Sequence, residues 1–188
     1  PGFFWPLRYL LFISSIILVN VKMTNTRKKS YFELTKKWQR VAVLSDAIAM
    51  LSWDRQAIMP SGSGAARAEQ IAILSVLKHE EITDPLTLEL IDKADKVELD
   101  DIEQKNLFEI RRIYRHAAAL SPKLVEEHSR ACAACEGQWQ LARKENNFQV
   151  VAGSLGEVVN LTQQIAAIKA DTFKCNSYDS LLDEYEPG

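Results

Sequence analysis

One segment of the sequence partly matches a zinc-binding motif. His79 and Glu80 begin like the pattern H-E-x-x-H, in which two histidines one helical turn apart bind the same zinc ion. The fifth position of the pattern is Thr83 instead of histidine, so the second ligand is missing. We therefore expect no metal ion to bind at His79.

A histidine and two cysteines form a second group of potential ligands. His128, Cys132 and Cys135 are spaced i, i+4 and i+7, which places them on one face of a helix. A rise of about 1.5 Å per residue separates His128 from Cys135 by roughly 10 Å, whereas zinc ligands lie at about 2.0–2.3 Å from the ion. All three therefore cannot share one ion, although any two could bind a metal together with ligands from elsewhere. We favour a face of small residues packed against a neighbouring helix, because free cysteine is commonly buried.

Cys132 and Cys135 also match the redox pattern C-x-x-C. That chemistry needs the first cysteine at a helix N-terminus, where the thiolate is stabilised. Here Cys132 lies about ten residues inside a helix that is expected to begin at Ser121, so a redox function is not favoured. His116 is expected in the last turn of its helix, where the interaction of a cation with the helix dipole accounts for it.

Motifs for nucleotide binding, calcium binding and serine nucleophiles do not occur in the sequence. There is no Walker loop, dinucleotide fingerprint, EF-hand or G-x-S-x-G pattern. The residue types and spacings alone therefore predict a soluble helical layer without a catalytic constellation of its own. We assign no catalytic, cofactor-binding or metal-binding residue.

The composition is that of an ordinary globular protein with one domain. The chain has 188 residues, of which 47% are hydrophobic and 26% are charged, and this composition excludes disorder as the main state. The net charge of −2 argues against a dedicated nucleic-acid binder, since such proteins need a basic surface. Three cysteines are too few for a disulfide framework and favour a reducing compartment.

Residues 1–22 differ in character from the rest of the chain. The uncharged apolar run over residues 9–21 is shorter than the roughly 20 residues that a spanning helix needs, and no signal-peptide cleavage site follows it. Met23 precedes a polar segment and resembles an initiator methionine. We expect residues 1–22 to be a non-native extension and the native protein to begin at Met23. A membrane-tethered domain, anchored through residues 9–21, is the alternative.

From Ser30 onward, apolar residues recur at steps of three and four, which predicts an all-α fold. Ser30 and Glu33 form a capping-box pattern, and Asp84-Pro85 and Ser121-Pro122 are helix-start signals. No segment alternates with period two for long enough to predict a strand. The expected helices cover residues 30–53, 65–81, a segment from Pro85, and residues 99–120, 122–144, 148–172 and 177–185. The apolar faces are expected to include Tyr31, Leu34, Trp38, Val41, Leu44, Ile48, Leu51, Ala68, Ile71, Ala72, Leu77, Ile102, Leu107, Ile110, Ile113, Tyr114 and Ala117.

Three ordered segments resemble the thermostable carboxypeptidase family of the carboxypeptidase Taq type. Residues 50–60 and 64–70 are similar to a W-D-x-x-x-x-M-P loop followed by a helix with R-A-x-Q. Residues 139–148 are similar to W-x-x-A-R-x-x-N-D-F, with Asn147 in the place of Asp, and residues 178–188 to Y-D-x-L-L-D-x-Y-E-P-G. The family's zinc motif H-E-x-x-H, further glutamate ligand, D-x-R-x-T and H-P-F motifs have no matching position here, so none of those residues can be transferred.

The resemblance implies an antiparallel helical layer that forms one wall of a zincin-like cleft. It implies a cytoplasmic metallocarboxypeptidase, with zinc or another divalent metal in the complete protein, peptide substrates, and a homodimer as a possible assembly. A metal-activated water, with glutamate as the general base, would then remove C-terminal residues from peptides. Residues 23–188 would be the N-terminal helical part of such an enzyme and inactive alone, and neither nucleic acid nor a membrane is an expected partner.

The matched residues have structural roles as their first interpretation. Trp53 is expected to seal the end of the first helix against the second. Asp54 is expected to cap local amides or pair with Arg55 or Arg67, and Arg143 to tether Asn146 or a carboxylate. The alternative is that Asp54 or Arg67 faces the cleft and positions substrate. A non-catalytic helical interaction protein remains open as a second function, beside the membrane-tethered domain.

Overall fold

The computed structural model describes residues 28–186, so the expectations for residues 1–22 and for Met23 lie outside the described residues. All regular structure in residues 28–186 is helical, which confirms the predicted all-α class. The first pair of long helices is α2 (Lys29–Ala57) and α3 (Gly64–Thr83), joined through the short turn η2 (Ser61–Ser63). The second pair is α6 (Pro122–Glu145) and α7 (Gln149–Phe173).

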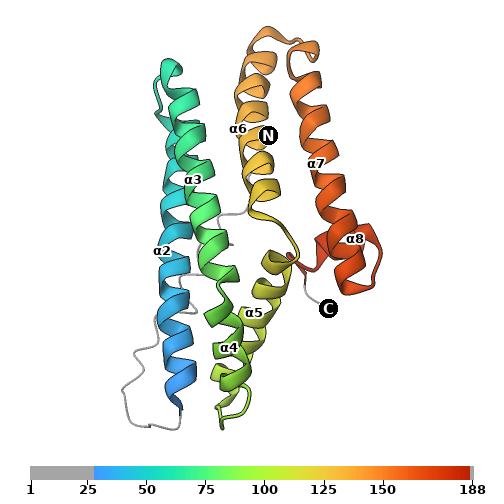
Figure 1. Ribbon diagram of the computed structural model, residues 1–188. Coiled ribbons are helices and arrows are strands. Elements are labelled where there is room, and N and C mark those ends of the chain that lie inside the picture. The colour runs from blue at the N-terminus through green and yellow to red at the C-terminus, as the bar shows by residue number, and fades with distance from the viewer. Residues whose placement is uncertain (1–27, 187–188) are drawn as a thin grey trace.

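The two long helix pairs stand side by side as antiparallel hairpins, and α3 packs against α6 between them (Figure 1). The shorter helices α4 (Pro85–Ala94) and α5 (Asp101–Ala118) connect the hairpins and lie at the lower end of the first one in this view. Helix α8 (Ser177–Leu182) packs against the end of α7. The arrangement is the antiparallel helical layer that the sequence predicted.

Two apolar clusters hold this layer together. The larger cluster joins the first half of α2 to α4, α5 and the end of α3, and the smaller one joins α6 to α7. Burial of these side chains removes apolar surface from water, which is the main favourable contribution to folding. The larger cluster contains Tyr31, Leu34, Trp38, Val41, Ile82, Leu90, Ile91, Ala94, Leu99, Leu107 and Ile110, and the smaller one Leu124, Ala131, Leu161 and Ile165.

Several local helix signals are confirmed. The Asp84 side chain accepts a hydrogen bond from the backbone N–H of Leu86 at 2.9 Å, directly before Pro85 at the start of α4. Ser121 caps α6 in the same way, through the N–H of Leu124 at 3.2 Å. Asn146 ends α6 in the left-handed conformation, with φ of 50°, which asparagine tolerates better than most residues.

The predicted capping box at Ser30 is wrong. Helix α2 begins at Lys29 and no side chain caps its N-terminus, so Ser30 already lies in the first turn. Lys28 forms an ion pair with Glu103 of α5, a tertiary contact at the first described turn of α2. Glu33 approaches Lys29 at 3.8 Å instead of returning to a cap. The helix also continues past the expected end at Trp53 to Ala57.

Two expected core residues lie on the surface, and one cap was missed. Leu77 is 46% exposed and Ile102 is 63% exposed, so neither belongs to the core of the described residues. Asp100 and Glu103 form a true capping box at the start of α5, in a D-x-x-E pattern that the sequence displays. Helix α7 runs through Gly153 and Gly156 without a break. Among residues 28–186, no helix is sufficiently long and apolar to span a bilayer.

Candidate functional site

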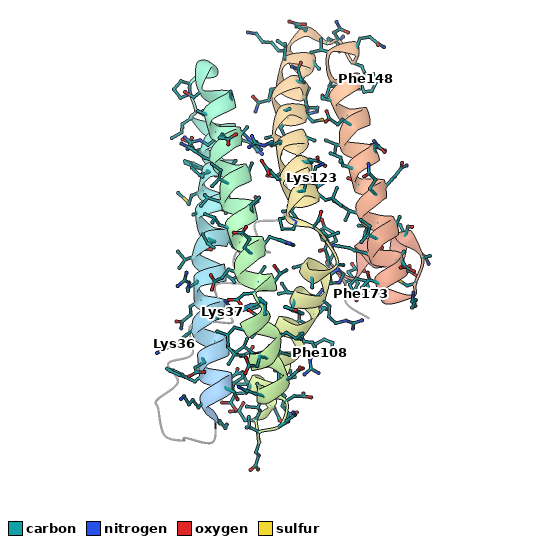
Figure 2. All side chains as sticks on the ribbon, in the orientation of Figure 1. Lys36, Lys37, Phe108, Lys123, Phe148 and Phe173 are labelled. Atoms are coloured by element: carbon teal, nitrogen blue, oxygen red, sulfur yellow. The ribbon has the colours of Figure 1, made fainter. Side chains whose placement is uncertain are left out.

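A large open groove runs along the helical layer. Its volume is about 2330 Å³, and its walls come from α2, α3, α5, α6 and α7, with the residues after α8 at one end. The lining is mainly apolar and includes Trp38, Ile71, Ile110 and Ile165. Figure 2 shows the side chains between the two hairpins, with Lys123 near the start of α6 and Phe148 and Phe173 at the two ends of α7. A groove of this size is the candidate functional site of the described residues.

All three histidines of the sequence line this groove. His79 is buried, and its burial lowers the pKa below the ordinary value of 6.5, although a hydrogen bond with the backbone of Leu120 and the charge of Glu80 oppose this effect. The neighbouring Thr83 hydroxyl donates to the carbonyl oxygen of His79 at 2.8 Å. Thr83, at the fifth position of the partial zinc motif, therefore uses its side chain for a hydrogen bond to the helix backbone.

His128 lies in the same groove on α6. Its Nε2 is 3.3 Å from the Thr162 hydroxyl of α7 and 3.7 Å from the sulfur of Cys132. Burial lowers the pKa of His128, and the nearby Lys169 ammonium lowers it further, whereas Glu184 has the opposite effect. His128 is therefore held mainly as a neutral imidazole at neutral pH.

The thiol beside His128 is not activated. Burial raises the pKa of Cys132 above its ordinary value of 9.0, and the charges of Glu136 and Cys135 raise it further, against a smaller opposite effect of Arg55. A thiolate is the reactive form of cysteine, so this environment disfavours nucleophilic and redox chemistry. No group of three or more His, Cys, Asp or Glu side chains that could hold a metal ion occurs among residues 28–186. The side chains of residues 28–186 therefore do not fit a divalent metal.

His116 joins α5 to the segment that follows α8. Its Nε2 is 2.7 Å from an Asp183 carboxylate oxygen, and its ring centroid is 4.5 Å from that of Phe173 at the end of α7. The prediction placed His116 in the last turn of its helix, and this is confirmed. The buried side chain nevertheless has a tertiary partner as well as the helix dipole.

Two lysines complete the polar part of the groove, and neither was predicted from the sequence. Lys169 of α7 is only 2% exposed and its Nζ is 2.6 Å from a carboxylate oxygen of Glu184. Lys78 of α3 is half-buried, and burial lowers its pKa, against an opposite effect of Glu184. In the sequence, each lysine stands at a position of its helix that is otherwise apolar. Such a position is common for lysine, because its aliphatic stem packs along apolar surface.

Of the residues in the W-D segment, some line the groove and others do not. Arg55 lines the groove and crosses from α2 to Glu136 of α6. Asp54 pairs with Arg67 of α3, which confirms one of the two predicted partners, and neither of these side chains lines the groove. The prediction for Trp53 is wrong, because its side chain is 55% exposed and does not seal α2 against α3.

Arg143 has a different contact from the one expected. Its guanidinium carbon lies 5.3 Å from the ring centroid of Trp139, one turn earlier on α6, which is a cation–π arrangement. The contact with Asn146 is through the backbone, because the N–H of Asn146 donates to the Arg143 carbonyl oxygen at 3.3 Å. The matched W-x-x-A-R segment thus stabilises the end of α6.

Comparison with known proteins gives consistent matches over most of the chain. Residues 33–188 match the family model described as carboxypeptidase Taq (M32) metallopeptidase. The chain is 29% identical over 174 residues to thermostable carboxypeptidase 1 of Thermus thermophilus, covering 87% of this chain and 34% of that protein. It is 27% identical over 157 residues to thermostable carboxypeptidase 1 of Pyrococcus furiosus, covering 83% and 31%.

Solved structures show the same fold over the same part. The BsuCP crystal structure aligns with a TM-score of 0.75 at 25% identity, covering 87% of this chain and 32% of that one. Metallocarboxypeptidase 1 of Trypanosoma cruzi aligns with a TM-score of 0.69 at 27% identity, covering 86% and 32%. The chain thus spans about a third of the length of the curated relatives it matches. The family match nevertheless extends over most of its residues, and the chain belongs to the carboxypeptidase Taq (M32) metallopeptidase family.

Proposed function

We propose that this chain acts as the N-terminal helical part of a metal-dependent carboxypeptidase that removes C-terminal residues from peptides. The observation that supports this most strongly is the family match over residues 33–188, joined with a groove of about 2330 Å³ along the matched helices. In this proposal the described residues form one wall of the peptide-binding cleft. The divalent metal, with zinc as the first candidate, is bound by another part of the polypeptide.

In this proposal, the metal-binding part of the polypeptide carries the reaction and the present chain holds the peptide. A bound divalent metal supplies a water activated for attack on the peptide carbonyl. The present chain contributes a mainly apolar groove surface against which the peptide packs. Two ion pairs with a buried cation connect the walls, since Lys169–Glu184 joins α7 to the residues after α8 and Arg55–Glu136 joins α2 to α6. The fragment is accordingly proposed to be inactive alone.

The nucleotide sequence that follows the codon for Gly188 tests the proposal most cheaply. An open reading frame that continues to an H-E-x-x-H motif is expected. The encoded longer polypeptide should release the C-terminal residue of a blocked dipeptide, and a chelator should abolish this release. A native stop codon directly after Gly188, together with a cooperatively folding chain, would instead support the helical interaction protein.

We infer that residues 1–22 lie outside the functional domain, since the family match begins at residue 33, and that the protein is cytoplasmic. The protein is proposed to form a homodimer and to bind neither nucleic acid nor membranes. Cell fractionation tests the location, and recovery in the membrane pellet with residues 1–22 intact would contradict a cytoplasmic protein. Light scattering on the purified protein tests the homodimer.

A further inference from the structure

The groove is more basic than the chain as a whole. The full sequence has a net charge of −2, whereas the side chains that line the groove include six lysines and arginines and four aspartates and glutamates. The three histidines add further hydrogen-bonding groups to the same lining. An acidic protein with a basic groove favours ligands of negative charge in that groove. The six basic residues are Lys36, Arg55, Lys78, Lys105, Arg112 and Lys169.

Three of these basic side chains, Arg55, Arg112 and Lys169, pair with carboxylates within the structure. Arg112 donates to Glu109 at 2.8 Å, and Lys169 lies 2.6 Å from Glu184. Lys78 differs from them, because no hydrogen bond or ion pair joins its ammonium group to any other described residue. It is half-buried on α3, where its positive charge lines a mainly apolar groove without a counterion in contact among the described residues.

Arg55 also has donors without partners. Its Nη2 donates to Glu136, but Nε and Nη1 are both buried and have no acceptor among residues 28–186. The side chain is only 10% exposed, so bulk water does not replace the missing acceptors. A buried donor without an acceptor costs roughly 1–3 kcal/mol, and such atoms in a binding groove indicate that a ligand supplies the acceptor.

The length of the groove fits a short peptide. The lining residues on α6 extend from Val125 to Glu136, which corresponds to roughly 16 Å along the helix axis. An extended peptide rises about 3.3 Å per residue, so this wall accommodates about five residues. The Arg55 contact marks one end of this wall, at Glu136. The apolar lining between the ends provides surface for the remaining side chains.

We propose that the groove binds an acidic peptide segment, with carboxylates paired to Lys78 and Arg55 and apolar side chains packed between them. This inference rests on the proposed function and specifies its substrate class: peptides that carry Asp or Glu several residues before the C-terminal bond. The carboxylate at Lys78 supplies the missing counterion. The carboxylate at Arg55 supplies an acceptor for the buried nitrogens, in the charge-assisted geometry that guanidinium favours.

The test measures peptide binding directly to the 188-residue chain, without any catalytic step. The probe is a C-terminally amidated hexapeptide with glutamates at positions 2 and 5 and leucines between them, titrated by isothermal titration calorimetry. Two matched peptides carry glutamine or lysine in place of glutamate. The variants are Lys78→Met and Arg55→Lys, and the control is Lys123→Met, whose side chain is 83% exposed at the start of α6 and does not line the groove (Figure 2). Circular dichroism establishes that each variant keeps its helical content.

We expect the glutamate peptide to bind about a hundredfold more tightly than the glutamine peptide, since each of its two partly buried ion pairs is worth about tenfold. Lys78→Met should weaken binding of the glutamate peptide about tenfold and leave the glutamine peptide unchanged. Lys123→Met should change neither. Raising the salt concentration should weaken the glutamate peptide selectively.

Equal binding of the three peptides, or an unchanged affinity in Lys78→Met, would overturn the proposal. An absence of binding to the folded chain at up to about 1 mM peptide, which corresponds to a binding free energy weaker than about −4 kcal/mol, would do the same. A dimer that Lys78→Met dissociates would show that a second copy occupies the groove instead. Because the assay needs no turnover, loss of the proposed carboxypeptidase activity with peptide binding intact would count against the proposed function and not against the groove.

Discussion

The guanidinium of Arg67 in α3 donates through Nη2 to the Asp54 carboxylate in α2 and thereby ties the two helices together beside the loop that joins them. Both side chains are about one-fifth exposed, at 22% and 23%. Arg67 has a further buried nitrogen, Nε, without a partner in the described residues. The pair thus holds the W-D and R-A-x-Q segments of the family resemblance in register.

Replacing Asp54 by alanine should destabilise the chain by about 1–2 kcal/mol, because a largely buried guanidinium then loses its charged partner. Urea unfolding followed by circular dichroism measures this change. Gln56→Ala, at an exposed position two residues later on α2, is the matched control and should stay within about 0.5 kcal/mol of the parent. A loss in Asp54→Ala no larger than in the control would contradict a stabilising role for the pair.

Replacing Glu184 should destabilise the chain more than replacing its ion-pair partner Lys169. Glu184→Gln leaves a lysine that is 2% exposed without its carboxylate, and we expect a loss of about 2 kcal/mol after allowing for the 42% exposure of the Glu184 side chain. Lys169→Met removes the charge and keeps the apolar stem, so its cost should be smaller. Urea midpoints of the two variants test this order. The reverse order would show that solvent already satisfies the ammonium group.

The stability of the chain should fall as the pH decreases from about 7.5 to about 5.5. Burial lowers the pKa of both His79 and His128 in the folded chain below the ordinary value of 6.5, so the unfolded chain binds more protons as the pH passes below that value. At higher pH the two histidines are neutral in both the folded and the unfolded chain, so they do not reduce stability. The loss of stability grows as the histidines of the unfolded chain become protonated. The free energy of unfolding in urea at several pH values measures it.

His128→Gln should flatten this pH dependence, because one of the two responsible groups is removed while a hydrogen-bonding side chain remains near Thr162. Lys123→Met, with its exposed side chain, should keep the slope of the parent. Greater stability at about pH 5.5 than at about pH 7.5 would contradict the prediction, since burial shifts the pKa of both His79 and His128 in the opposite direction.

The three cysteines should differ in their reactivity with iodoacetamide. Burial and the charge of Glu136 raise the pKa of Cys132, so little thiolate exists at about pH 7.5, and the thiol is half-buried as well. Cys175 is exposed and should react first. Mass spectrometry of peptides after timed quenching gives the rates. In concentrated urea the rates of Cys132 and Cys175 should converge. A faster reaction at Cys132 than at Cys175 in the folded chain would indicate that His128 activates the Cys132 thiol.

The helices and several of their ends follow from the sequence because their causes are local. The three- and four-residue spacing of Tyr31, Leu34, Trp38 and Val41 alone predicts one buried helical face, and the structure confirms it. The caps at Asp84 and Ser121 and the break at Asn146 depend on hydrogen bonds or dihedral angles within a few residues. The family resemblance likewise rests on segments that can be read from the chain, and the match over residues 33–188 confirms it.

Only the tertiary structure decided three features: the start of α2, the exposure of Trp53 and the composition of the groove. A capping pattern at Ser30 does not reveal that the helix begins one residue earlier, where Lys28 pairs with Glu103 from another helix. Whether Trp53 is buried depends on which surface faces it, and no periodicity states that. Lys78, Lys169 and Glu184 come together from α3, α7 and the residues after α8, so no spacing along the chain relates them. Local geometry sets the elements, whereas the charge and burial of the groove arise from contacts between residues far apart in sequence.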